Sequence, residues 1–312
     1  MKKQPLLWGV IYLVMLLLTF TPLVLVTICL MMVPVVVMYV KLDWKRFALH
    51  HVLILLAVYV ISFLLGLDFL GTVAAILFLF FLIPSLAIGV MYRKRATARA
   101  ALTAGTVAML VQLLLLLLIL TVSGIHVIDE LRDYMKNSLE TLPAELQNLV
   151  TADQIEVALS LMTKLLPLYL IGFSLFYAIV THWLARKALV RSGESIPGLK
   201  AAKDWMLPRS LIWYYLIALI LSFIYVNPDE SMIFMILLNI MPLMMFVFTI
   251  QAFGFLFFIA HHRGWSKGVP RFIAVIGILV LLFAPFLLQM VSLFGLFDVA
   301  FPIRERLKRP KG

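Results

Sequence analysis

The sequence predicts an all-α fold: a polytopic transmembrane helical bundle with eight or nine apolar spans and an acidic amphipathic helical segment outside the membrane. Two observations predict this fold class. Of the 312 residues, 64% are hydrophobic and only 13% are charged, whereas a soluble domain is about half apolar and about a quarter charged. The hydrophobic residues also form runs that reach the roughly 20 residues needed to cross the hydrocarbon core of a bilayer. This composition excludes an ordinary cytosolic enzyme.

The first half of the chain contains five of the expected spans. The apolar run over residues 6–40 has 35 residues, which is too long for one crossing. Thr19-Phe20-Thr21-Pro22 interrupts this run and predicts a tight hairpin between a helix ending near Phe20 and a second helix over 22–40. Three more spans are expected over residues 49–66, 71–91 and 100–122.

The second half begins with a polar, acidic segment, residues 123–163, which we expect to be an extracytoplasmic helical insertion. Apolar residues at spacings of three and four over 125–142 predict one amphipathic helix. Thr151 and Gln154 have the spacing of a capping box that opens a second helix. The insertion is interpreted either as a lid or docking surface, or as a cap resting on the bilayer interface. Further spans are expected over 164–185, 209–226, 232–260 and 272–303, with Pro285 inside the last.

The distribution of charge predicts a cytoplasmic N-terminus. With this orientation 18 of the 26 basic residues fall in cytoplasmic loops and three in outer segments, as the positive-inside rule requires. The net charge of +11 is therefore attributed to loops facing the anionic inner leaflet, and no nucleic-acid partner is expected. Five more basic residues lie in a tail at 304–312. Nine full crossings would place this tail outside, whereas a re-entrant half helix in the last apolar run would return it to the cytoplasm. We expect residues 1–312 to form a single integral membrane domain.

The chain lacks the short motifs that mark common catalytic and nucleotide sites, namely HExxH, GxSxG, the P-loop and the Rossmann glycine pattern. The single cysteine, Cys29, excludes an internal disulfide and a multi-cysteine metal site. Two adjacent histidine pairs, His50-His51 and His261-His262, make poor chelates because neighbouring side chains on a helix point about 100° apart. We expect these histidines to be solvated at the interface, and we expect no catalytic residues, no metal and no cofactor.

Polar side chains within the apolar runs are the candidate substrate-binding residues, because an unpaired polar group is costly in a bilayer. Four are neutral amides within apolar runs: Gln112, Asn239, Gln251 and Gln289. The fifth is a carboxylate, Asp68, at the outer end of a hairpin. Each amide either contacts a substrate or hydrogen-bonds a neighbouring helix, and Asp68 is either a turn residue or a substrate contact. We expect no Asp, Glu, Lys or Arg to be buried in mid-membrane, which argues against a proton pump or a proton-relay antiporter.

Small residues repeat at every fourth position along the fifth expected span. They are Ala96, Ala100, Ala104 and Ala108. A second small-residue row, Thr97, Ala101 and Gly105, lies beside them. Such rows allow close approach of helices, so the stripe serves either helix packing within this chain or docking of a partner membrane protein.

The C-terminal third carries a family resemblance. Gln251-Ala252-Phe253 is followed by a short basic loop with Gly264, a proline-bearing apolar run, Gly295-Leu296-Phe297-Asp298 and Arg304. Together with Trp205-Met206-Leu207-Pro208, this pattern resembles the YybS family of predicted bacterial membrane proteins. The motif positions are Trp205, Pro208, Gly295, Asp298 and Arg304.

The resemblance implies a multi-pass protein of the bacterial cytoplasmic membrane. The YybS family is distantly similar to the substrate-binding components of energy-coupling-factor transporters. That similarity implies binding of a small-molecule substrate rather than catalysis, with the lipid bilayer and a transmembrane coupler with ATPases as partners. The alternatives are a non-transporting scaffold or assembly factor for envelope machinery, and an enzyme acting on lipid. An enzyme of that kind would show a cluster of His, Asp or Glu at one interface, and the sequence shows none.

Overall fold

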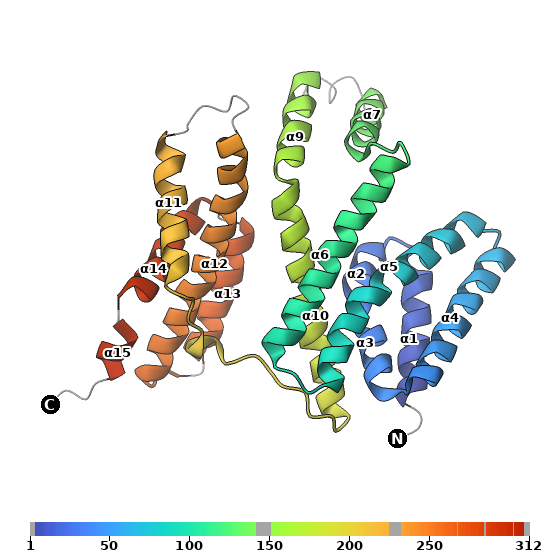
Figure 1. The fold of residues 1–312 in the computed structure, drawn as a ribbon, viewed down its shortest axis with the longest axis horizontal. Coiled ribbons are helices and arrows are strands. Elements are labelled where there is room, and N and C mark those ends of the chain that lie inside the picture. Colours follow the sequence, from blue (N-terminus) through green and yellow to red (C-terminus); the bar gives the residue numbers. More distant parts are fainter. Residues whose placement is uncertain are drawn as a thin grey trace. The chain divides into compact units, whose positions relative to one another are not determined.

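A computed structural model describes residues 4–141, 151–224, 232–266, 268–283, 285–301 and 303–308. Every element in these ranges is a helix (Figure 1), which confirms the predicted all-α class. The part of the acidic segment at 142–150 and the end of the span expected over 209–226 lie outside the described residues. The chain divides into two compact units. Unit 1 comprises residues 1–149 and 169–199, and unit 2 comprises residues 150–168 and 200–312.

Unit 1 contains seven helices and most of an eighth among its described residues. These are α1 (Gln4–Leu18), α2 (Val24–Leu30), α3 (Met32–Lys41), α4 (Trp44–Leu64), α5 (Asp68–Arg93), α6 (Ala98–Val122), α7 (Val127–Glu140) and α10 (Leu166–Arg191). The predicted hairpin is confirmed, since α1 ends at Leu18 and α2 begins at Val24. The hydroxyl groups of Thr19 and Thr21 donate to the carbonyl oxygens of Leu16 and Leu18 at this break.

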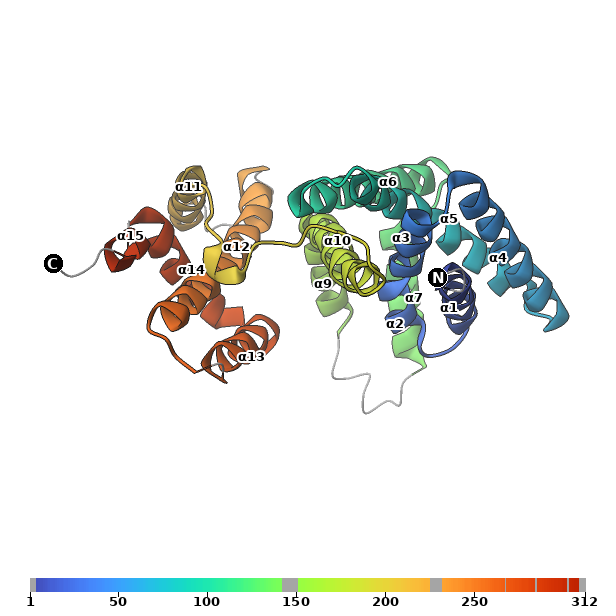
Figure 2. The ribbon, with the colours of Figure 1, turned by 90° about the horizontal axis from the view of Figure 1, so that it is seen from below.

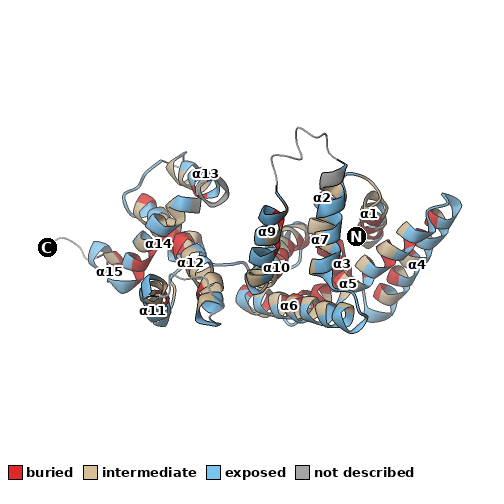
Figure 3. Cartoon of the chain, turned by 90° about the horizontal axis from the view of Figure 1, so that it is seen from above, coloured by how far each residue is buried: buried red, intermediate tan, exposed pale blue. Residues whose placement is uncertain are grey.

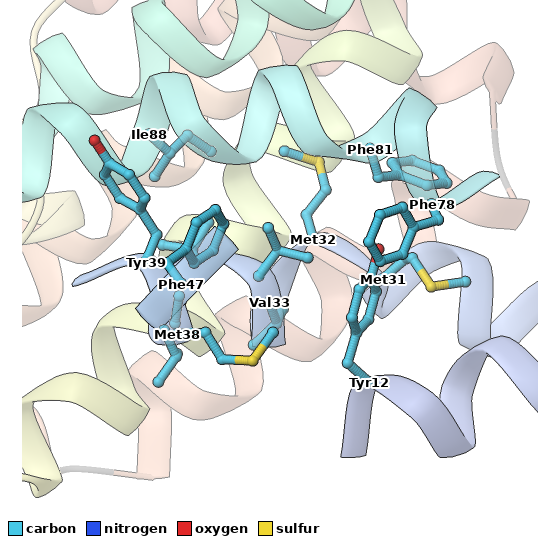
Figure 4. Packing of buried hydrophobic residues seen from close by; sticks show 14 of the residues in the cluster. Tyr12, Met31, Met32, Val33, Met38, Tyr39, Phe47, Phe78, Phe81 and Ile88 are labelled. Carbon is cyan, nitrogen blue, oxygen red and sulfur yellow. The ribbon is translucent and has the colours of Figure 1, made fainter. Parts of the chain in front are cut away.

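Helix α3 lies at the centre of unit 1. All eight residues from Met32 to Tyr39 are buried, and α3 packs against α1 and α5. Figure 4 shows how Tyr12, Met31 and Phe78 meet beside it. Large apolar side chains on the other helices, such as Leu53 and Leu118, remain exposed (Figure 3). An apolar helix enclosed by others, with apolar outward faces around it, is the expected arrangement in lipid.

Helix α6 packs through the second of its two small-residue rows. Ala101 and Gly105 are buried, and a Cβ atom added at Gly105 would lie 2.6 Å from the Ile88 side chain of α5. Glycine is therefore required for this close approach. The predicted stripe Ala96, Ala100, Ala104 and Ala108 is only half-buried.

Unit 2 contains α9 (Ala152–Lys164), the start of α10, a 3₁₀ turn η1 (Ala202–Asp204), α11 (Ser210–Ile224), α12 (Met232–His262), α13 (Gly268–Phe283), α14 (Pro285–Ala300) and α15 (Ile303–Lys308). Figure 2 shows α11 and α14 beside α12. Tyr215, Phe248, Leu296 and Val299 form its apolar core. The predicted last run, 272–303, is divided into α13 and α14 around Pro285. The capping box at Thr151 and Gln154 is confirmed.

Six helical segments are long and apolar enough to cross a membrane: Val24–Lys41, Trp44–Leu64, Asp68–Arg93, Ala98–Val122, Leu166–Arg191 and Met232–His262. Four shorter apolar helices of 10–17 residues accompany them: Pro5–Leu18, Ser210–Ile224, Gly268–Leu279 and Phe286–Ala300. Each apolar run identified in the sequence is thus helical. Length and composition alone support six crossings among the described residues.

Candidate functional site

A buried ionic cluster in unit 2 unites three of the residues singled out in the sequence: Gln251, Asp298 and Arg304. Asp298 lies on α14 and is fully buried. Arg304, on α15, donates from Nε to Asp298 Oδ1 at 2.9 Å and from Nη2 to Oδ2 at 2.5 Å. Gln251, from α12, donates through Nε2 to the same Oδ2 at 2.5 Å. The carboxylate thus receives a two-pronged guanidinium and an amide, which is the geometry that stabilises a buried charge.

The segment over residues 203–207, which precedes α11, is hydrogen-bonded to this cluster. Arg304 Nη1 donates to the carbonyl oxygen of Lys203 at 2.7 Å, and the amide of Leu207 donates to Gln251 Oε1 at 3.1 Å. Trp205 adds a bond within the segment, from its indole nitrogen to the Lys200 carbonyl oxygen at 2.7 Å. Hydrogen bonds of Gln251, Asp298 and Arg304 therefore connect α12, the adjoining helices α14 and α15, and the 203–207 segment.

Asp298 is an ionisable side chain that is buried near the C-terminal end of the apolar run over 272–303. Its carboxylate is tolerated there because Arg304 neutralises it and three donor atoms satisfy its oxygens. All three polar groups bond to other parts of the chain. The cluster therefore positions helices, and it leaves no strong donor directed toward a ligand.

Gly295 brings α14 close to α12 beside this cluster. A Cβ atom at this position would lie 1.9 Å from the carbonyl oxygen of Phe248, well inside van der Waals contact. Pro208, by contrast, is exposed, and its carbonyl oxygen accepts from the Leu211 amide as α11 begins. Among the motif positions, Gly295 thus lies at a close helix contact, Pro208 lies at a helix start, and Asp298 and Arg304 belong to the ionic cluster.

A small apolar cleft of about 180 Å³ lies beside the 203–207 segment in unit 2. Side chains and backbone from three elements line it: Ala202, Trp205, Ile250, Phe253, Gly254, Phe257, Ala274, Gly277 and Ile278. The cleft contains no charged residue, so it offers shape but little means of orienting a polar solute.

Asn239 joins α12 to the junction between α9 and α10. Its Oδ1 accepts from the Leu168 amide at 3.0 Å, and its Nδ2 donates to the Lys164 carbonyl oxygen at 2.8 Å. The structure thus favours the second of the two interpretations of this amide, a hydrogen bond to a neighbouring helix.

The three other candidate substrate residues are Asp68, Gln112 and Gln289. Asp68 is exposed in the first turn of α5, where a carboxylate is favourable near the helix N-terminus. Gln112 is half-buried on α6, with Oε1 unpaired within the described part of the chain. Gln289 is exposed on α14. The candidates are therefore divided between the two units, with Asp68 and Gln112 in unit 1 and Asn239, Gln251 and Gln289 in unit 2.

One of the paired histidines, His51, differs from expectation, whereas His261 and His262 are exposed. His51 is buried rather than solvated, with its ring centroid 4.1 Å from that of Phe47 and 5.1 Å from that of Phe78. His261 is exposed, and its Nε2 lies 2.8 Å from Lys203 Nζ. The described residues show no group of three or more His, Cys, Asp or Glu side chains able to hold a metal ion.

A larger pocket in unit 1, here named the α1–α10 pocket, has a volume of about 460 Å³. Its walls come from α1, α2, α3 and α10, and its lining residues are Leu7, Trp8, Met15, Leu30, Val33, Leu184, Lys187, Ala188, Arg191 and Ser192. Apolar side chains form most of the wall. The two cations, Lys187 and Arg191, are exposed near the end of α10.

Sequence reasoning counted Lys187 and Arg191 only as charges of a basic loop. Their spacing was the sequence feature that could have identified them as a pair, since residues four apart on a helix lie on one face. The apolar walls left no comparable signal, because nearly every residue of α1 and α2 is hydrophobic.

Comparisons with known proteins agree with this helical membrane architecture. Residues 10–299 match the DUF2232 family, which is described as "Predicted membrane protein". The chain is also 25% identical over 230 residues to the Uncharacterized protein YybS of Bacillus subtilis (strain 168), covering 72% of this chain and 73% of that relative. No solved structure matches the chain. The resemblance to the YybS family is confirmed, and the chain belongs to the DUF2232 family of predicted membrane proteins.

Proposed function

We propose that this protein is the substrate-binding component of a membrane transport system and that it binds a small molecule in the α1–α10 pocket. The observation that carries the proposal is the pocket itself. Its volume of about 460 Å³ falls within the range of about 300–1,000 Å³ that is typical of small-molecule sites. Mostly apolar walls with a few convergent polar groups are also typical of such sites.

The energy for transport is proposed to come from a partner, a transmembrane coupler with ATPases. This part of the proposal extends the expectation, drawn from the sequence, that the family is distantly similar to energy-coupling-factor components, and the sequence contains no P-loop. The chain would then supply recognition of the solute, and the partner would supply the conformational work.

Isolation of the tagged protein in mild detergent, with mass spectrometry of the bound proteins, tests this proposal. Recovery of a transmembrane coupler together with its ATPases is expected. Recovery of envelope-assembly proteins, or of no partner, would contradict it.

The second candidate function is a non-transporting scaffold for envelope machinery. Unit 2 favours it, because the Gln251, Asp298 and Arg304 side chains are bonded to one another and to the 203–207 segment. A cluster of this kind holds a fixed surface more readily than it binds a ligand. The same isolation experiment separates the two functions.

We further propose eight effective crossings of the cytoplasmic membrane, with a cytoplasmic N-terminus and an external acidic segment. In a Cys29→Ser background, a single cysteine is placed either at Lys94 or at Glu130, both of which are exposed. A membrane-impermeant maleimide added to intact cells is expected to label Glu130→Cys and to leave Lys94→Cys unmodified. The reverse labelling would invert the proposed orientation.

A further inference from the structure

We infer that the α1–α10 pocket binds an anionic lipid, with the acidic headgroup held by Lys187 and Arg191 and the upper part of an acyl chain lying against α1, α2 and α3. This inference rests on the proposed use of the pocket as a ligand site and names the class of its ligand. Charged and apolar surfaces are separated within the pocket.

The cationic side of the pocket is formed by the last turns of α10. Lys187 and Arg191 are four residues apart and both line the cavity. A third cation lies next to it, since Lys41 Nζ donates to the carbonyl oxygen of Ser192, a lining residue, at 3.5 Å. None of the residues that the structure places in the lining is acidic. A guanidinium and two ammonium groups without a lining carboxylate favour a phosphate-bearing ligand.

The apolar side is formed by residues from three other helices. Trp8 and Met15 are seven residues apart on α1 and both line the cavity. This spacing corresponds to about two helical turns, or roughly 10 Å along the axis. Leu30 of α2 and Val33 of α3 continue the same wall. An apolar wall of this length suits an acyl chain better than it suits a compact polar solute.

Basic side chains at the end of a membrane helix commonly extend toward the interface without binding a specific ligand. Lys187 and Arg191 differ from that pattern because both line a cavity that has apolar walls. Lys94 and Arg95, in the loop after α5, are exposed cations that do not line the pocket. They provide a matched control of equal charge.

The test uses the full-length protein in nanodiscs of phosphatidylcholine that contain a trace of photoreactive phosphatidylglycerol. Peptide mass spectrometry locates the adducts. We expect adducts on peptides of α1 and α10 and a clear preference over a phosphatidylcholine probe with the same photoreactive chain. Each cation near an anionic lipid surface contributes about 1 kcal/mol, or about fivefold. Lys187→Gln with Arg191→Gln should therefore reduce the preference about 25-fold, while Lys94→Gln with Arg95→Gln should leave it within about twofold.

A second variant tests the apolar wall. Leu30→Trp fills part of the cavity without altering its charge, and we expect it to remove the adducts from α1 while the protein still elutes as a folded species. Unchanged labelling in this variant would overturn the placement of the chain. Equal labelling by the phosphatidylcholine probe, or equal loss in the two charge variants, would overturn the role of Lys187 and Arg191.

Further outcomes distinguish a lipid site from a site for a soluble anion, and the lipid inference from the proposed transport function. Displacement of the phosphatidylglycerol probe by inorganic phosphate alone would identify a site for a soluble anion and would overturn the lipid assignment. Recovery of a coupler with ATPases, without any lipid preference, would refute the lipid inference while supporting the proposed transport function. Pocket adducts without a coupler would support the lipid inference and contradict that function.

Discussion

Replacing Arg304 by glutamine removes the cation that faces the fully buried carboxylate of Asp298. Arg304 makes a two-pronged contact with this carboxylate and also donates to the Lys203 carbonyl oxygen. After the substitution, Gln251 Nε2 is the donor left from the original cluster. Loss of one partner of a buried ion pair costs roughly 3–5 kcal/mol, since the remaining charge is buried and uncompensated. We therefore expect Arg304→Gln to reduce the free energy of unfolding by about this amount.

The reciprocal substitution should cost less. Asp298→Asn leaves Arg304 with its bond to the Lys203 carbonyl oxygen and with about a tenth of its side-chain surface exposed. The double variant should therefore be more stable than the sum of the two single effects predicts, with a coupling energy of roughly 2 kcal/mol or more. Arg306, two residues further along α15, is exposed, so Arg306→Gln is the matched control and should change stability by less than about 0.5 kcal/mol.

The assay is equilibrium unfolding of the purified protein in mixed micelles of dodecylmaltoside and dodecyl sulfate, followed by circular dichroism. Wild type, the two single variants, the double variant and Arg306→Gln are compared under the same conditions. The reasoning is refuted if Arg304→Gln is no more destabilising than Arg306→Gln. Additive single effects, to within about 0.5 kcal/mol, would equally show that the two side chains do not act as a pair.

Two further predictions concern helix contacts. Gly295→Ala should separate α12 from α14 and cost more than about 2 kcal/mol in the same assay, because its Cβ has no space. Gly172→Ala, whose Cβ meets nothing within 4 Å, should be neutral or slightly stabilising, and equal effects of the two substitutions would contradict the packing argument. Asn239→Ala should cost about 0.6–1.7 kcal/mol and accelerate hydrogen exchange of the Leu168 amide, which loses its acceptor. Unchanged exchange at Leu168 would show that this bond is not formed in the membrane.

The positions of the helices were predictable because each apolar run is long and its interruptions contain turn residues. The break between α1 and α2 contains Thr19-Phe20-Thr21-Pro22. In the last apolar run, α14 begins at Pro285. In lipid a helix satisfies its own backbone hydrogen bonds, so hydropathy alone locates it. The second helix, expected over 22–40, is interrupted at Met31, three residues before Pro34, whose ring nitrogen has no hydrogen to donate to the Leu30 carbonyl oxygen.

The ionic cluster was only partly predictable. Gln251 was identified as a polar residue in an apolar run, and Asp298 and Arg304 were identified through the family pattern. Their pairing was missed because Arg304 was assigned to a basic tail, six residues beyond Asp298. Helix α15 begins at Ile303, three residues after α14 ends at Ala300, and the Arg304 side chain bonds back to Asp298 of α14. Such a reversal depends on tertiary structure and leaves no periodic signal.

Polar side chains join several of the helices in this protein, and such bonds matter in lipid because apolar surfaces pack nearly as well against lipid as against each other. Asn239 is bonded at the α9–α10 junction, and Arg93 donates to the carbonyl oxygens of Tyr39 and Leu42. These side chains, like Asp298, bond to other parts of the chain. Lys187 and Arg191, in contrast, line a ligand-sized cavity. A residue whose hydrogen bonds hold two helices together has little capacity left for a solute. For this reason we assign ligand binding to the α1–α10 pocket rather than to the amides that the sequence made conspicuous.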